Sequence, residues 1–112
     1  MGKSMSLLQG TLDVLVLRAL EAEPRHGYAV AEWIRARTEG ALEIEDGALY
    51  TALHRMEKRG YLAAEWGLSH NNRRAKFYSL TRAGRRELAS ASADWNAYAA
   101  AVAKVLQPDG GS

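Results

Sequence analysis

The chain has 112 residues, of which 47% are hydrophobic, and its 15 basic and 13 acidic residues leave a net charge of +2. The composition is typical of a globular protein, and the length is enough for one domain but not for two. A domain this small is often stabilised by oligomerisation. The absence of cysteine excludes disulfides and thiolate metal sites, and no apolar run approaches the roughly 20 residues of a membrane span. With too few apolar residues at the start for a signal peptide, we expect a cytoplasmic protein.

Apolar residues recur at helical spacing in the first part of the chain. They predict an amphipathic helix over about 8–22, which Pro24 ends because proline cannot continue a helix. A second helix is predicted over 27–38, with Gly40 as its C-terminal stop. His26 directly precedes this second helix and is expected to cap it or to pack locally.

A third helix is predicted from Asp46, a favourable N-cap residue, to about Arg59, where Gly60 stops it. One face is apolar and is expected to be buried around Leu49. The opposite face is polar, basic and small near its start, which suits a helix that enters the DNA major groove and meets phosphates and base edges. The predicted DNA-contacting residues of this face are Gly47, Tyr50, Thr51, His54, Arg55 and Lys58.

A β-hairpin is predicted after the third helix, because the hydrophobic period changes. Residues 61–66 and 76–80 are short runs with aromatic residues, and the segment 67–74 between them is polar and rich in turn formers. We therefore expect a hairpin with a long tip. Trp66 and Phe77 are expected to pack the hairpin onto the core rather than to stack on bases.

The hairpin tip concentrates cations and amides, which suits contact with a DNA backbone or minor groove. The predicted DNA-contacting residues of the tip are Asn72, Arg73, Arg74 and Lys76. Residues 47–86 hold nine basic and two acidic residues, whereas both flanking segments are net acidic. This distribution indicates a polyanion-binding face, with an ordinary solvated surface as the alternative.

Thr81 is expected to cap a final helix that runs to about Leu106, followed by a disordered tail over 107–112. Apolar residues along this helix are spaced as in a coiled-coil seam. The seam consists of Leu88, Ala91, Trp95, Tyr98, Val102 and Val105. A helix of about 25 residues would be roughly 37 Å long, too long for so small a domain to cover. We therefore predict a homodimer interface here, with packing on the chain's own core as the alternative.

The order of these elements predicts a mainly α fold with a β-hairpin: a winged helix-turn-helix followed by a long C-terminal dimerisation helix. The expected organisation is a DNA-binding domain over 7–81, a dimerisation helix over 82–106 and the tail over 107–112. Because architecture alone does not give function, the third helix and the hairpin tip carry the functional prediction. They predict a transcriptional regulator that binds double-stranded DNA at an inverted repeat.

The sequence resembles the PadR family of bacterial transcriptional regulators from about Leu7 to Leu106, most closely its short members with a single C-terminal dimerisation helix. The resemblance rests on LQGTLD (8–13), EPRHGY (23–28), GALYTALHRME (47–57), RGYL (59–62), EWG (65–67) and NNRRAKFYSLTRAG (71–84), in this order and spacing. It implies a winged-helix dimer that represses its target and is often released by small aromatic compounds. Ala48 and Thr51 replace the small hydroxyl residue and the proline that are usual in the family, which leaves the operator sequence open.

Trp95 lies at the centre of the predicted seam, where two-fold symmetry would bring two indoles together. Such a pair either fills the interface as core or flanks an apolar pocket in which a flat aromatic compound stacks. Small neighbours such as Ala99 leave room beside the ring, and the family resemblance adds weight to a ligand pocket at Trp95 and Ala99. Core packing is the interpretation that we favour.

We do not expect an enzyme, a metal site or a cofactor. His26, His54 and His70 belong to different predicted elements, and the sequence has no Gly-rich phosphate loop, metal-ligand cluster or activated nucleophile. The competing function is a small-molecule-sensing or adaptor protein with weak DNA binding, which would not need so many converging cations. RNA binding is disfavoured because the major groove of an A-form duplex is too narrow to admit a helix.

Overall fold

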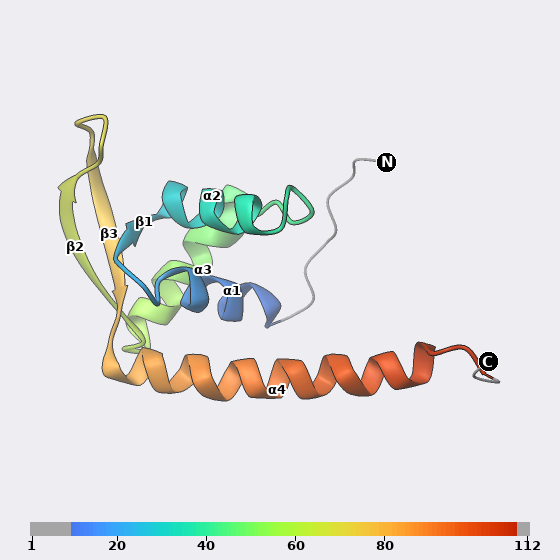
Figure 1. Ribbon diagram of the computed structural model, residues 1–112. Helices are drawn as coiled ribbons and strands as arrows, with labels where there is room; N and C mark the ends of the chain where they lie inside the picture. Colours follow the sequence, from blue (N-terminus) through green and yellow to red (C-terminus); the bar gives the residue numbers. More distant parts are fainter. Residues whose placement is uncertain (1–9, 110–112) are drawn as a thin grey trace.

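The computed structural model describes residues 10–109, which form four helices and a three-stranded sheet (Figure 1). The elements are α1 (Thr11–Ala19), β1 (Arg25–His26), α2 (Gly27–Arg37), α3 (Asp46–Lys58), β2 (Leu62–Leu68), β3 (Arg74–Leu80) and α4 (Arg82–Leu106). This order confirms the predicted winged helix-turn-helix with a long C-terminal helix. Within residues 10–109, no helix is long and apolar enough to cross a membrane.

Helix α1 is shorter than the sequence predicted. It ends at Ala19 rather than near residue 22, because the N–H groups of Leu20 and Glu21 already bond to carbonyls three residues earlier. Such bonds tighten the last turn, and the chain leaves helical geometry before it reaches Pro24. The helix begins at Thr11, and the first two residues of the predicted helix lie outside the described range.

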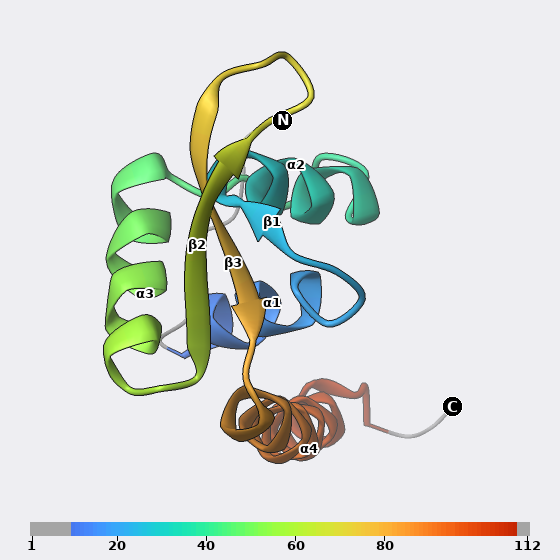
Figure 2. The same cartoon turned by 90° about the vertical axis from the view of Figure 1, so that its left-hand side faces the viewer.

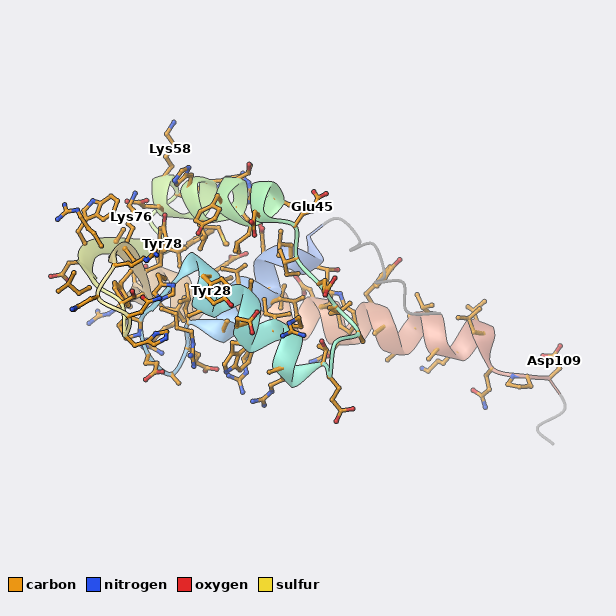
Figure 3. The ribbon with its side chains drawn as sticks, turned by 90° about the horizontal axis from the view of Figure 1, so that it is seen from above. Tyr28, Glu45, Lys58, Lys76, Tyr78 and Asp109 are labelled. Carbon is orange, nitrogen blue, oxygen red and sulfur yellow. The ribbon has the colours of Figure 1, made fainter. Side chains whose placement is uncertain are left out.

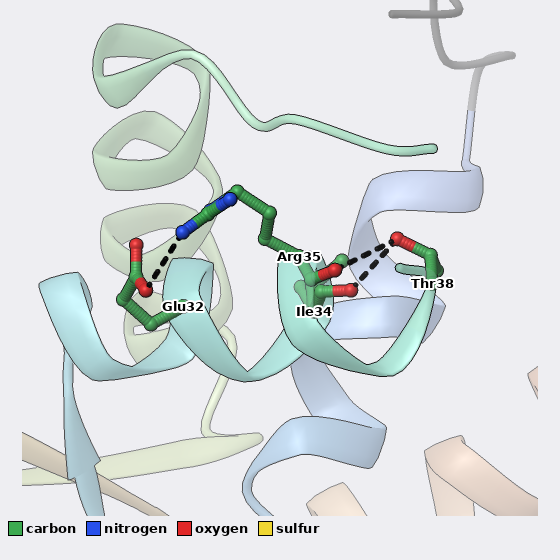
Figure 4. Close-up of polar contacts among 4 residues, drawn as sticks. All are labelled: Glu32, Ile34, Arg35 and Thr38. Carbon is green, nitrogen blue, oxygen red and sulfur yellow. Dashed lines mark hydrogen bonds and ion pairs between the residues drawn. The ribbon is translucent and has the colours of Figure 1, made fainter. Parts of the chain in front are cut away.

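Helix α2 has the ends that the sequence predicted. Its N-cap is His26, whose Nδ1 accepts a hydrogen bond of 3.2 Å from the N–H of Ala29. At the other end, the hydroxyl of Thr38 donates to the carbonyl of Ile34 over 3.0 Å (Figure 4). Gly40 has a φ of 84°, a left-handed conformation that suits glycine and ends the helical path.

Helix α3 starts one residue earlier than an Asp46 cap would require, because Asp46 is itself the first helical residue. The N-cap is Glu45, and no side chain accepts a hydrogen bond there. Asp46 instead lies in the first turn, where the helix dipole favours a carboxylate. The predicted end is confirmed: Lys58 is the last helical residue and Gly60 has a φ of 84°.

The sheet is antiparallel in the order β1-β3-β2, and its register pairs Leu62 with Leu80 and Leu68 with Arg74. The strands are longer than predicted, so the tip spans 69–73 rather than 67–74. Strand β1 was not predicted because two residues carry no hydrophobic period. The hairpin forms a wing that projects past the helices, at the end of the molecule remote from α4 (Figure 2).

The core lies between α1, α2, α3 and the base of the wing. Its buried residues are Val16, Leu17, Ala19, Leu20, Val30, Ile34, Leu49, Ala52, Leu53, Met56, Leu62, Tyr78 and Leu88. Thr81 caps α4 as predicted, since its hydroxyl accepts from the N–H of Gly84 over 3.0 Å. A Cβ at Gly84 would collide with the carbonyl oxygen of Tyr61, so glycine lets α4 start close against the core. From there α4 extends well beyond the body (Figure 1).

Candidate nucleic-acid interface

Helix α3 divides into the two faces that the sequence predicted. Leu49, Ala52, Leu53 and Met56 are buried in the core, whereas Gly47, Tyr50, Thr51, His54 and Lys58 are exposed. Lys58 points outward from the C-terminal end of the helix (Figure 3). A polar, basic helix face is therefore open along the length of α3.

Tyr50 lies directly over the start of α2. A Cβ at Gly27 would lie 2.6 Å from the Tyr50 hydroxyl oxygen, so only glycine leaves room for the ring in this position. The close approach holds the first turns of α2 and α3 together. Tyr50 keeps 43% of its surface exposed, which leaves its outer edge available to a ligand.

Arg55 differs from the other predicted residues of α3, because its guanidinium is engaged within the chain. Its Nη1 and Nη2 donate to the two carboxylate oxygens of Asp13 on α1, over 2.7 and 2.9 Å. Hydrogen bonding to Asp13 is the largest of the effects that raise the pKa of Arg55. The structure thus places the guanidinium of Arg55 between α1 and α3, whereas the other predicted residues of α3 lie on its exposed face.

The tip of the wing is a tight, hydrogen-bonded turn. The N–H of Ser69 donates to the carbonyl of Arg73 over 2.8 Å, and the N–H of Asn72 donates to the carbonyl of Ser69 over 2.9 Å. Asn72 adopts a φ of 63°, which asparagine tolerates better than most residues. The turn leaves the side chains of Asn72 and Arg73 exposed.

Trp66 does not pack on the core, contrary to the sequence-based expectation. By strand alternation it shares a face with Leu62 and Ala64, but it lies farther along the wing, where it lines an open groove, and 56% of its surface is exposed. The guanidinium of Arg74 lies 4.8 Å from the centre of its ring, a cation–π contact that orients the cation. Phe77 is half-buried and packs edge-on against His26. It is not among the residues that pack against the core, so the expected core contact of Phe77 is not found either.

Lys76 is also paired within the chain. Its ammonium lies 3.2 Å from a carboxylate oxygen of Glu57 on α3 and 5.6 Å from the centre of the Tyr78 ring. The hydrogen bond to Glu57 is the main cause that raises the pKa of Lys76. This contact ties the wing to the last turns of α3.

A groove of about 770 Å³ separates the wing from the start of α2 and the exposed face of α3. Its lining includes His26, Tyr28, Tyr50, His54, Trp66, His70, Asn71, Arg73, Arg74 and Lys76. Of the predicted DNA-contacting residues, the groove brings together Tyr50 and His54 of α3 with Arg73, Arg74 and Lys76 of the wing. Its lining does not include Gly47, Thr51, Arg55, Lys58 or Asn72. The groove also gathers all three histidines, although they belong to different elements. Among residues 10–109, no three acidic or histidine side chains are placed to hold a metal ion.

Sequence reasoning missed three aromatic contributors to this groove: Tyr28, Trp66 and the ring of His26. Tyr28 is 66% exposed and follows Gly27 at the start of α2. No signal in the sequence indicates that Trp66 is exposed. Its position beyond Leu62, the core residue of β2, becomes clear only from the length of the strand in the structure.

Helix α4 presents a second exposed surface, which is apolar. Leu88 is 6% exposed and belongs to the core of its own chain, so it is not free for a partner, contrary to its place in the predicted seam. Ala91 is half-buried. The later seam residues are exposed, Trp95 by 39%, Tyr98 by 57%, Val102 by 38% and Val105 by 82%.

Trp95 is held against α1, where its indole Nε1 donates to the hydroxyl of Thr11 over 3.1 Å. Beside it lies a hollow of about 290 Å³. Its lining consists of Thr11, Val14, Leu15, Arg18, Leu42, Ser92, Trp95 and Asn96. The hollow includes Trp95, as expected, but Ala99 is not part of its lining.

Comparison with known proteins points to one family. The profile of the transcriptional regulator PadR-like family matches residues 16–90. A Lysinibacillus sphaericus protein of unassigned function is 28% identical over 89 residues, which cover 80% of this chain and 82% of that protein. A transcriptional regulator from Clostridium thermocellum superposes with a TM-score of 0.77 at 26% identity, covering 86% of this chain and 90% of that chain. A PadR family transcriptional regulator from Eggerthella lenta gives 0.74 at 33% identity, covering 90% and 86%.

Proposed function

The chain belongs to the PadR-like family of transcriptional regulators, and we propose that it is a repressor that binds an inverted-repeat operator as a homodimer. The observation that carries this proposal is the groove between α3 and the wing, which brings Arg73, Arg74 and Lys76 of the wing together with Tyr50 and His54 of α3. A concave surface of this chemistry suits a duplex, whose phosphates need cations and whose base edges need hydrogen-bonding side chains.

In the proposed complex, α3 enters the major groove of one half-site. Gly47 has nothing within 4 Å of the position of a Cβ, so the start of the helix is free to approach the DNA backbone. Thr51 and His54, on the exposed face, contact base edges. Lys58 contacts a phosphate from the outer side of the helix.

The wing contacts the backbone or the adjacent minor groove. Asn72 and Arg73 reach it from the tip. Arg74, already oriented by the ring of Trp66, supplies a second cation with less side-chain freedom to lose on binding. Lys76 contributes charge while it remains paired with Glu57.

Two copies are proposed to pair along the exposed seam of α4. The support is the apolar surface of Trp95, Tyr98, Val102 and Val105, which the described part of the chain leaves uncovered. Exposed apolar rows of this kind mark protein contacts. In this proposal residues 7–81 bind DNA and residues 82–106 join the two copies. Part of the tail predicted over 107–112 lies outside the described residues.

A small aromatic ligand is proposed to release the repressor by binding in the hollow beside Trp95. The hollow has room for a compound of modest size and an indole on which a flat ring can stack. Release requires that the ligand bind the DNA-incompetent arrangement better than the competent one. The compound 1-anilinonaphthalene-8-sulfonate is a suitable first probe, and its binding, measured by calorimetry, is expected to be lost in Trp95→Ala.

The experiment that tests the proposed function is selection of bound fragments from the host's genomic DNA, followed by mobility-shift titration. We expect a dimer on an inverted repeat, with half-site centres about 34 Å apart or a small multiple of that distance. Absence of a shift on every fragment at low salt would contradict DNA recognition and favour the alternative, a small-molecule-sensing or adaptor protein.

A further inference from the structure

The first turn of α1 contacts two helices that are distant in sequence. Thr11 accepts a hydrogen bond from Trp95 of α4, and Asp13 accepts two from Arg55 of α3. Helix α1 lies between α4 and the rest of the helices in both views of the ribbon (Figures 1 and 2). One turn of helix therefore carries polar contacts to both the DNA-reading helix and the proposed dimerisation helix.

The contact between Asp13 and Arg55 is directional. A guanidinium that donates two parallel hydrogen bonds to a carboxylate has a narrow range of geometries. The apolar contacts that bury Leu49 and Leu53 hold α3 against the core, but hydrophobic burial is non-directional. The ion pair is therefore suited to set how α3 is rotated about its own axis, and hence where Thr51 and His54 point.

Thr11 performs the corresponding task towards α4. Its hydroxyl fixes the indole of Trp95, and that residue lies where the exposed seam of α4 begins. A small change in the angle between α1 and α4 moves a DNA-reading helix that is held on α1. In a two-fold dimer such a change alters the distance between the two copies of α3.

We propose that the first turn of α1 positions DNA recognition: Asp13 sets the orientation of α3 through Arg55, Thr11 sets the angle of α4 through Trp95, and together they fix the operator spacing. This inference rests on the proposed function, because it needs a dimer that binds two half-sites. Arg55 is then a positioning residue and not a DNA contact. Arg59, which follows α3, is exposed and serves as a matched control.

The test measures affinity for the operator recovered by the genomic selection and for versions with one base pair added to or removed from its spacer. The wild type is expected to bind the operators with altered spacers about tenfold more weakly. One base pair more or less changes the distance between the half-sites, so the two copies of α3 can no longer make all their contacts at once. In Asp13→Asn and in Thr11→Val, we expect this preference to shrink to about threefold or less. In Arg59→Ala, the ratio of affinities among the three spacers is expected to stay as in the wild type.

Two results would overturn the proposal. If Arg55 contacted DNA, Asp13→Asn would free it and strengthen binding on all spacers, and Arg55→Ala would reduce the salt slope by about 1. An unchanged spacer preference in both variants of α1 would also contradict it. The exchange Asp13→Arg with Arg55→Asp guards against a simple folding defect, because restoring the pair is expected to restore the preference.

A measurement without DNA separates this inference from the proposed function. In ¹H–¹⁵N spectra of the free protein, Asp13→Asn is expected to shift amides throughout α3, because the whole helix turns. Shifts confined to the neighbours of residue 13 would overturn the positioning role. Failure of the wild type to bind any fragment, with shifts throughout α3, would overturn only the proposed function.

Discussion

The two exposed surfaces of this molecule differ in how complete they are. The groove between α3 and the wing is built by one chain, and its cations are already oriented: Arg74 by the ring of Trp66 and Lys76 by Glu57. The outer part of α4 has apolar side chains such as Tyr98 and Val105 that no described residue covers. The first surface is formed by the groups of a single chain, whereas the second leaves apolar groups exposed to water.

The difference follows from the chemistry of the two surfaces. A polyanion is attracted to cations that stay hydrated until it arrives, so a basic groove is stable in water by itself. An apolar row is unfavourable in water at all times, and burying it contributes free energy roughly in proportion to its area. We therefore expect changes on α4 to act on assembly first and on DNA second, and changes in the groove to act on DNA alone.

The largest effect is expected from Tyr98→Lys. A charge in the middle of the apolar seam opposes pairing, and DNA affinity should fall by about 100-fold because the second half-site is no longer tethered. Sedimentation should find a monomer at micromolar concentration. Ala100→Lys, which helical geometry places on the opposite side of α4, is the control and should remain dimeric. A dimeric Tyr98→Lys protein with wild-type affinity would remove α4 from the proposed interface.

Gly27→Ala should have the next largest effect, since it disturbs the groove from within. The added methyl group displaces the ring of Tyr50, which costs about 1 kcal/mol in the free energy of unfolding and weakens DNA binding by roughly tenfold. Gly47→Ala is the control for stability: the new Cβ meets nothing, so higher helix propensity should stabilise α3. Thermal unfolding measures the stability of the two variants, and mobility-shift titration measures their DNA affinity. Equal melting temperatures for the two variants would show that the Tyr50 contact is loose.

Smaller effects are expected from single side chains of α3 and the wing. Lys58→Ala and Arg74→Ala should each weaken binding on every sequence and reduce the salt slope by about 1, because each removes one phosphate contact. Thr51→Ala and His54→Ala should instead change which sequences are preferred, by about 1–3 kcal/mol at the base that is read. Titrations at several salt concentrations, on specific and scrambled duplexes, separate the two classes. If all four variants lost DNA affinity equally on every duplex, the proposed orientation of α3 on the DNA would be wrong.

The smallest effect concerns pH and the base of the wing. Burial raises the pKa of Tyr78, so the unfolded phenol ionises first as the pH rises through about 10. Stability is therefore complete below pH 10 and is lost as the pH passes through the folded pKa. Tyr78→Phe should lose less stability between pH 9 and 11 in thermal unfolding. A steeper loss in the variant than in the wild type would contradict burial as the cause.

Most of the fold was accessible from the sequence because local signals agreed. The cap of Thr81, the stops at Gly40 and Gly60 and the apolar face around Leu49 each act over a few residues. The errors arose where such signals were weak or ambiguous. Aspartate is favourable both as an N-cap and within the first turn, so the sequence did not show that Asp46 is the first helical residue and Glu45 the N-cap. The two residues of β1 are too few to show a period.

The candidate site was only partly accessible. The sequence predicted cations on α3 and on the hairpin tip. It could not show that Lys58 points outward whereas Arg55 is paired with Asp13. These two positions are three residues apart on one helix, and their tasks differ because a partner 42 residues away in sequence faces only one of them.

The sequence by itself determined the four helices, the two strands of the hairpin and their order, because these depend on neighbours within a few residues. It also determined the basic middle of the chain and the apolar row on the last helix. Only the tertiary structure decided which charged side chains form ion pairs within the chain. It also decided that Trp66 lies beyond the core, and that Leu88 belongs to the chain's own interior while Tyr98 does not. Those outcomes depend on which distant side chain arrives within a few ångströms, and on where the body of the domain ends along α4 and the wing.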